Sequence, residues 1–363
     1  MTIKGHDATR RHRRGMTDAL RPAPADVPED RALLRAAAEL TRDLQAPRAW
    51  IYWGDCFGSA AVGYGALAGA VLARGWWAFA CGVVAVVALY RALLFIHEMT
   101  HVNHALLPGF RVAWNVVVGC PLLIPSFMYE GIHAIHHTRT KYGTVEDPEY
   151  LPLALMSWWS LPLFLAAAVA MPGLLLLRFG VVGPVSWVVP GFRTFVVARW
   201  SGLQINPRFA RRRPEGAFAR QWFWEEAGAS AVAVAVLVSA AAGWLPWRVL
   251  GIGVAVVAGV AVLNQVRTLV AHRWENDGPQ LTVTGQFLDS ANVPEGVLAW
   301  LWAPVGLRWH ALHHLLPGVP YHALGTAHRR LSAAMGADST YAGANYRSLG
   351  VLVRELAAGT ARR

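Results

Sequence analysis

The sequence has few charged residues and few cysteines, and both shortages narrow the classes of protein that it can encode. Only 15% of its 363 residues are charged, whereas a soluble domain usually has roughly 25%. Its three cysteines, Cys56, Cys81 and Cys120, lie in apolar stretches without CxxC spacing, which argues against disulfides and against a thiolate metal site. With 55% hydrophobic residues and a mean hydropathy of +0.34, the composition predicts a membrane protein.

We also expect no export, because the first 14 residues have neither an apolar core nor a small-residue cleavage site. The formal charge of +11 is instead concentrated near the N-terminus and in one middle loop. Basic segments beside spans stay in the cytoplasm, so we expect a cytoplasmic N-terminus. Since these clusters flank hydrophobic spans, we expect no nucleic-acid binding. The clusters are Lys4, Arg10, Arg11, Arg13 and Arg14, and then Arg208, Arg211, Arg212, Arg213 and Arg220.

Long apolar runs come in pairs. Residues 57–73 and 76–96 form one pair, and residues 227–247 and 249–271 form another. A helix of about 20 residues crosses the hydrocarbon core of a bilayer, so each pair predicts a transmembrane hairpin that returns the chain to its starting side.

Two further apolar stretches are interrupted. Residues 113–128 are too few for a span and contain Pro121 and Pro125, which favours a re-entrant or interfacial segment. Residues 151–198 are broken by several Gly and Pro residues, and we expect an even number of crossings or an interfacial pair there.

These patterns predict an all-α integral membrane protein with two transmembrane helical hairpins, re-entrant or interfacial helices and a cytoplasmic histidine-rich cap. We divide the chain into a basic cytoplasmic leader (1–48), a membrane domain (49–335) and a polar C-terminal tail (336–363). Within the leader, residues 30–45 have the pattern of an amphipathic helix whose apolar positions lie on the membrane surface. A partly ordered leader is the alternative.

Histidines gather at the ends of the apolar runs in three groups. On a helix, residues three and four apart share a face, so each group turns several imidazoles towards one point. Neutral imidazole binds Fe, Zn, Cu and Ni well, and the paired spans place all three groups on one side of the membrane. The groups are His97 and His101, then His133, His136 and His137, and finally His310, His313 and His314.

The first group is also an HExxH motif, the signature of a zinc metalloprotease with Glu98 as general base. Such a site uses three protein ligands and would leave the other groups unexplained, so we interpret Glu98 as a partner that orients a histidine ring. His104 extends the group, but it lies a turn further on and its role as a ligand stays open. His6 and His12 belong to the basic leader and are expected to be solvated.

The sequences HEMTH (97–101), HAIHH (133–137) and HALHH (310–314) resemble the three histidine boxes of the membrane-bound fatty acid desaturase superfamily, which also includes hydroxylases and ketolases. The resemblance covers roughly residues 50–330. It implies a non-haem diiron centre and a ninth histidine at the end of the last span, which NQVRTLVAHRW places at His272. His322 and His328 follow the third box and are expected to be structural. The implied metal ligands are His97, His101, His133, His136, His137, His272, His310, His313 and His314.

The resemblance further implies an oxidoreductase that uses dioxygen and two Fe ions to desaturate a long-chain fatty acyl lipid in the membrane. The alternatives are a hydroxylase or ketolase acting on a lipid or carotenoid, and the zinc metalloprotease. A metal transporter or sensor is disfavoured, because the spans are chiefly Ala, Val, Leu and Gly. We expect the location to be a bacterial inner membrane.

Two electrons per turnover would have to come from outside, since the chain has no HPGG haem segment, dinucleotide fingerprint or iron-sulfur cysteine set. A ferredoxin, rubredoxin or cytochrome b5-like donor could dock on residues 208–213, although these arginines could equally sit at lipid headgroups. Eight carboxylates lie near the histidine groups, and we expect some to accept a hydrogen bond from a metal-bound ring and at least half to be solvated. They are Glu98, Glu130, Glu146, Asp147, Glu149, Glu275, Asp277 and Asp289.

Overall fold

The computed structural model describes residues 24–295 and 298–361. The basic residues of the first 14 positions, with His6 and His12, therefore lie outside the described residues. Every regular element in the described part is a helix or a helical turn, as the sequence predicts. Five of these helices are long and apolar enough to cross a membrane, which makes the chain an all-helical protein with several candidate spans.

The first two long helices form the first hairpin. Helix α3 (Ala49–Leu72) and helix α4 (Gly75–Leu93) pack along their length, and α4 runs on into the short helix α5 (Phe95–Glu98). The turn between them exposes Trp76 and Trp77. Tryptophan is enriched at membrane interfaces, so this turn marks the end of the hairpin that lies far from the histidines.

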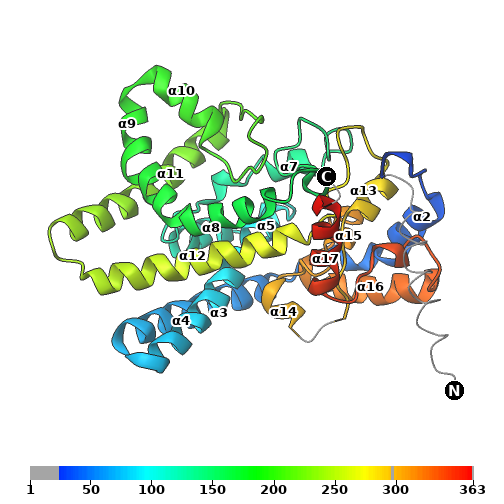
Figure 1. Ribbon diagram of the computed structural model, residues 1–363, viewed down its shortest axis with the longest axis horizontal. Helices are drawn as coiled ribbons and strands as arrows, with labels where there is room; N and C mark the ends of the chain where they lie inside the picture. The colour runs from blue at the N-terminus through cyan, green and yellow to red at the C-terminus, as the bar shows by residue number, and fades with distance from the viewer. Residues whose placement is uncertain (1–23, 296–297, 362–363) are drawn as a thin grey trace.

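The second pair of long helices is arranged differently from a simple hairpin. Helices α11 (Gly216–Ala241) and α12 (Trp247–Leu269) follow one another, with Trp244 and Trp247 exposed at their turn. Helix α12 packs chiefly on α4 and on α8 (Ser160–Leu177), whereas α11 packs on the π-helical turn that follows α8 (Figure 1). The apolar stretch 151–198 thus supplies a fifth long helix, which runs with α9 (Gly183–Val188) to residue 188 before α10 (Pro190–Arg199) turns away.

The segment expected to be re-entrant consists of short helical turns. These are α6 (Phe110–Trp114), a π-helix (Asn115–Gly119) and a 3-10 turn (Ser126–Met128), none of which is long enough to span a bilayer. The segment is held by α4, because the Trp114 indole donates to the Ala92 carbonyl oxygen at 2.9 Å. It is also held by α11, where the Glu225 carboxylate accepts from the Phe127 N–H at 2.7 Å.

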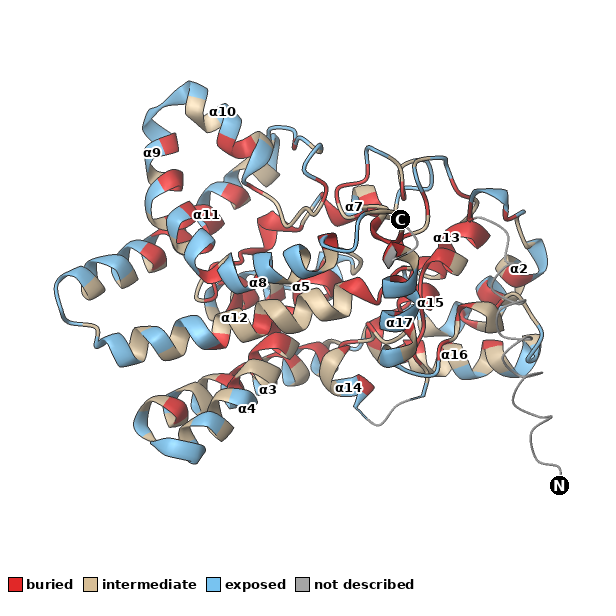
Figure 2. Ribbon diagram, in the orientation of Figure 1, coloured by how far each residue is buried: buried red, intermediate tan, exposed pale blue. Residues whose placement is uncertain are grey.

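The remaining helices form a cap at one end of the long helices (Figure 1). Buried residues are concentrated there and where the long helices meet it, whereas the opposite ends of the long helices are largely exposed (Figure 2). Such a distribution of buried residues is typical of a compact centre at one end of helices whose outer surfaces face lipid. The cap helices are α2 (Arg31–Leu40), α7 (His133–His136), α13 (Val283–Asp289), α14 (Ala299–Trp302), α15 (His310–Leu315), α16 (Tyr321–Met335) and α17 (Leu349–Ala361).

Helix α2 corrects one expectation. Its apolar residues Leu33 and Ala37 are buried against the protein's own cap, in a cluster that includes Leu312 and Leu331, and not on a membrane surface. Asp30 caps the helix by accepting from the N–H groups of the first turn. Amphipathic periodicity indicates which face is covered but not by what, so the sequence could not distinguish lipid from protein.

The C-terminal segment likewise packs on the cap. The stretch expected to be a polar tail ends in α17, whose residues Leu352 and Leu356 are buried. Leu356 lies in the same cluster as Tyr142, Tyr150 and Trp274, beside the histidine centre. Both ends of the described chain therefore contribute to the environment of the histidines.

Candidate metal centre

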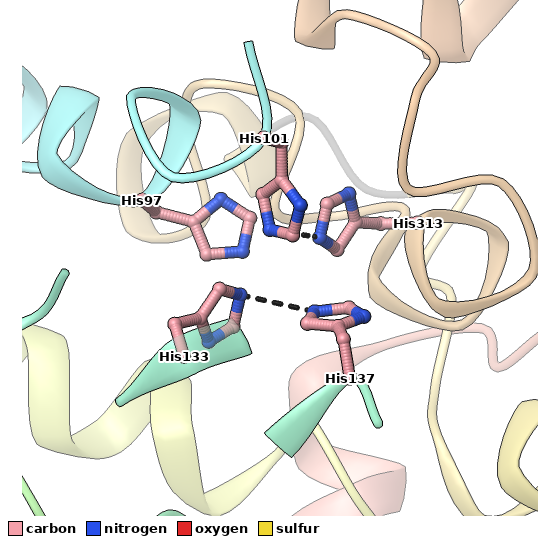
Figure 3. A group of neighbouring side chains, drawn as sticks. All are labelled: His97, His101, His133, His137 and His313. Atoms are coloured by element: carbon pink, nitrogen blue, oxygen red, sulfur yellow. Dashed lines mark hydrogen bonds between the residues drawn. The ribbon is translucent and has the colours of Figure 1, made fainter. Parts of the chain in front are cut away.

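The structure gathers nine histidines into two adjacent groups. In each group, one nitrogen of every ring lies within 4.8 Å of the corresponding nitrogens of the others. All nine histidines singled out in the sequence take part, and His104, His322 and His328 do not. The first group, shown in Figure 3, is His97, His101, His133, His137 and His313, and the second is His136, His272, His310 and His314.

Helical spacing divides two of the sequence motifs between the groups. In α7 and the residue that follows it, His133 and His137 are four apart and share a face directed at the first group, while His136 points to the second. Helix α15 does the reverse, because His310 and His314 reach the second group and His313 the first. Each HxxHH motif therefore joins the two groups.

The rings meet through their Nε2 atoms. These atoms are 3.0 Å apart in His133 and His137 and 3.1 Å apart in His101 and His313. In the second group the Nε2 of His310 lies 3.0 Å from that of His272 and 3.2 Å from that of His314. A neutral imidazole has a single N–H. Two facing Nε2 atoms can therefore share one hydrogen bond, but several Nε2 atoms that converge on one point cannot all be paired by hydrogen bonds among the rings.

Buried nitrogens without partners show what the centre would accommodate. Among the described residues, neither ring nitrogen of His97 has a hydrogen-bond partner, nor does the Nδ1 of His310 or of His314. Leaving buried polar atoms unpaired costs free energy, about 1–3 kcal/mol each. A cation in the first group would take one of the unpaired nitrogens of His97, whereas the unpaired Nδ1 atoms of His310 and His314 are not the atoms that meet in the second group. Together with the converging Nε2 atoms, the nitrogen set fits two metal ions that prefer imidazole.

The outward nitrogens of the second box donate to carboxylates. His133 Nδ1 lies 2.9 Å from Glu149 Oε1, and His136 Nδ1 lies 2.9 Å from Asp147 Oδ2. Tyr129 donates its hydroxyl to the other oxygen of Glu149, also at 2.9 Å. A histidine that donates from Nδ1 to a carboxylate presents a free Nε2 lone pair, which is the usual arrangement of a metal-bound ring.

His272 is oriented through a tyrosine. The hydroxyl of Tyr142 donates to Asp289 at 2.9 Å, and since that is its only proton, His272 Nδ1 must donate to the tyrosine oxygen, 2.8 Å away. Tyr150 donates to the same Asp289 oxygen at 2.8 Å. The result again leaves the Nε2 of His272 free to face the second group.

Electrostatics favours neutral, ligand-competent rings. Burial lowers the pKa of His101 to about 3 and lowers that of His313 and His314 well below the ordinary value, with neighbouring rings adding to the effect. For His136, burial also disfavours the charged form, but Asp147 outweighs it and raises the pKa. Burial raises the pKa of Glu149 and of Asp289 to about 7. A nearby cation would hold both carboxylates ionised, which fits a metal centre.

Glu98 does not orient a ring as expected. Its Oε2 accepts from the Tyr52 hydroxyl at 2.7 Å and from the Tyr321 N–H at 3.2 Å, and its Oε1 lies 3.8 Å from His97 Nδ1, outside hydrogen-bond range. Glu98 thus ties the first box to α3 and α16. The same contacts remove it from the role of a protease base, and His101 shares its group with three histidines from other segments.

The other histidines and carboxylates lie outside the two groups. His104 is exposed, 3.9 Å from Glu130, while His322 accepts from the Arg48 N–H and His328 bonds to Tyr341 and stacks on Trp309. Glu130, Glu146 and Glu275 pair with basic side chains, and Asp277 is exposed. Sequence reasoning missed Tyr129 and Tyr142. Tyr129 precedes His133 by one helical turn and could have been noticed, whereas Tyr142 meets His272 only in the fold.

An apolar cavity of about 240 Å³ lies among the long helices. Residues of α3, α4, α8, α11, α12 and the segment expected to be re-entrant line it, including Leu67, Leu89, Leu122, Leu175, Val232 and Val257. Such a cavity has the chemistry of a hydrocarbon-chain site.

Comparison with known proteins gives two matches. The model of the fatty acid desaturase family matches residues 74–345. A ceramide hydroxylase of Caulobacter vibrioides (strain NA1000 / CB15N) is 45% identical over 341 residues, which cover 92% of this chain and 96% of the relative.

Proposed function

Because the chain belongs to the fatty acid desaturase family and is an oxidoreductase of the desaturase and hydroxylase superfamily, we propose that it hydroxylates a ceramide-type sphingolipid within the membrane. From the sequence alone, desaturation of a fatty acyl lipid is the main expectation and hydroxylation is the alternative. The similarity to a ceramide hydroxylase over nearly the whole of both chains supports the alternative.

We propose that the nine histidines hold two iron ions, one in each group. The observation that carries this proposal is the convergence of nine imidazoles from distant segments, seven of which meet another ring through Nε2 and three of which have a carboxylate or a tyrosine behind them. Bound iron supplies activation of dioxygen by reduced metal next to open coordination positions. The chain's own residues fix the ring orientations and keep the surrounding space poor in water.

The overall reaction inserts one oxygen atom of dioxygen into a C–H bond of the lipid, and the other atom leaves as water with two electrons and two protons. A separate donor must supply the electrons. We propose that it docks near the exposed Arg208, Arg212 and Arg213 through charge attraction. Arg211 is not available for docking, because it is buried, donates to the carbonyl oxygens of Ser201 and Glu130, and stacks on Trp222.

The finer topology is part of the same proposal. The exposed tryptophan pairs at 76–77 and at 244 and 247 lie at helix turns far from the histidines. The exposed arginines 208, 212 and 213 belong to a loop on the histidine side, because Asn206 in that loop donates to the carbonyl oxygen of Asp147, whose carboxylate holds His136. Basic loops favour the cytoplasmic side. The histidine groups and the N-terminus would then face the cytoplasm of a bacterial inner membrane, with the lipid chain in the apolar cavity.

The test is lipid mass spectrometry of cells that make the wild type or His137→Ala and are supplied with isotopically labelled dioxygen. The proposal expects ceramides heavier by one labelled oxygen atom in wild-type cells and none in the variant. Lipids lighter by two hydrogens, without labelled oxygen, would instead support desaturation and overturn the proposal.

A further inference from the structure

A charged residue lies inside the last long helix, just before the histidine centre. Arg267 belongs to the last turn of α12, which ends at Leu269, three residues before His272. Charged side chains within spans are costly and are usually kept for a function. In the described part of the chain, Arg267 forms no ion pair with a carboxylate; its Nη2 donates to Asn264 Oδ1 at 3.1 Å, and its guanidinium group also interacts with the Tyr90 hydroxyl.

The guanidinium group is incompletely satisfied. Its Nε is buried and has no hydrogen-bond partner among the described residues. Arg178 is more deeply buried than Arg267 and its charge is paired, because it lies 2.6 Å from Glu226 and donates to the Trp200 carbonyl oxygen, although its Nη1 also has no hydrogen-bond partner among the described residues. A buried donor that the protein leaves unpaired is suited to an acceptor from outside the chain.

Arg267 lies between the apolar cavity and the histidines. Gly253, Val257, Val260, Asn264 and Arg267 follow one another at spacings of four, three, four and three residues, so they share one face of α12. Gly253 and Val257 line the cavity, so its lining on this face begins about 15 Å from Arg267, at Val257, and continues to about 21 Å, at Gly253.

The surroundings match the polar end of a lipid. Beside this face, Tyr90 of α4 donates its hydroxyl to the Trp302 carbonyl oxygen at 2.9 Å, which joins α4 to the short helix α14. Trp300 of α14 and the preceding Leu298 are both exposed, and such side chains suit a membrane boundary. A lipid with its hydrocarbon chain in the cavity would therefore bring its polar group to Arg267 and Asn264.

We propose that Arg267, supported by Asn264, binds the amide carbonyl oxygen of the lipid substrate and so fixes which carbon reaches the histidine centre. This inference rests on the proposed function, because a ceramide has an amide. It makes Arg267 a specificity-determining residue, and it places the oxidised carbon within a few bonds of the amide and not near the end of the chain.

The test uses binding to the full-length protein with its metal in place and without an electron donor, so that no turnover occurs. A radiolabelled long-chain ceramide and an analogue whose amide carbonyl is replaced by methylene are titrated in detergent. A hydrogen bond to a charged donor changes affinity by about tenfold to a hundredfold, so wild type is expected to prefer ceramide by at least about tenfold. Because this comparison uses only the wild-type protein, it does not depend on whether a variant folds.

Variants then test whether Arg267 causes the preference for ceramide over the analogue. Arg267→Gln is expected to lose it, Arg267→Lys to retain part of it, and the control Arg74→Gln, an exposed arginine in the far turn, to bind like wild type. Equal binding of the two lipids by wild type, or an unchanged preference in Arg267→Gln, would overturn the inference and leave ceramide hydroxylation intact. A wild type that binds free fatty acid through Arg267 and never hydroxylates ceramide would overturn both.

Discussion

The two histidine groups differ in how far the protein closes them off. In the group of five, His101 and His137 are only partly buried, whereas all four histidines of the second group are buried. The second group also has more support, since Asp147 holds His136, and Tyr142, Ser290 and Asp289 stand behind His272. The comparison indicates one site open to small molecules and one site sealed by the fold.

The largest effect should come from removing a ligand of either group. His137→Ala in the open group and His314→Ala in the sealed group are each expected to lower lipid hydroxylation by on the order of a thousandfold or more, because the chemistry needs both metals. Iron analysis of the purified variants should show that each has lost about half of the wild-type iron. If either variant kept full activity, the two groups could not form one centre.

Removing a carboxylate behind a ring should have a smaller effect. Asp147→Asn keeps the shape but weakens the acceptor for His136, and Glu149→Gln does the same for His133. Such partners are usually worth 10-fold to 100-fold in metal affinity or activity, so we expect about that loss in hydroxylation rate. The contrast between the groups predicts that Asp147→Asn is the more damaging, and the opposite order would contradict it.

Chelation should separate the two sites in time. The partly exposed histidines of the first group give a chelator access that the second group denies, so iron is expected to leave in two phases of similar amplitude, the first at least several-fold faster. Iron release is followed by absorbance with a coloured chelator, and His137→Ala should lack one phase. A single phase in the wild type would show that the difference in burial does not control release.

The smallest effect is expected outside both groups. His104 belongs by sequence to the first box, yet it is exposed and lies beside Glu130. His104→Ala should leave iron content and hydroxylation rate within about twofold of wild type, as for other surface substitutions. Loss of iron from this variant would mean that His104 is a further metal ligand of the first group.

Much of this arrangement could be predicted from the sequence. Helical spacing and apolar run lengths are local properties, so they indicated four of the five long helices and the nine histidines that converge. The division of each HxxHH motif between two groups also follows from helix geometry once α7 and α15 are in place.

The rest depends on contacts between distant residues. Tyr142 and Asp289 are 147 positions apart, and Glu98 meets Tyr321 across 223 positions, so no local pattern could show that the first pair orients His272 or that the second anchors a helix. Likewise, α8 packs against α12 where the sequence indicated only a simple hairpin of α11 with α12. Tertiary packing decides these features.

The most direct test of two iron ions held by the two histidine groups is anomalous X-ray diffraction at the iron edge from crystals of the purified full-length protein. The account predicts two iron peaks, one among His97, His101, His133, His137 and His313 and one among His136, His272, His310 and His314. A single peak, or zinc at His97 and His101 with the second group empty, would contradict it.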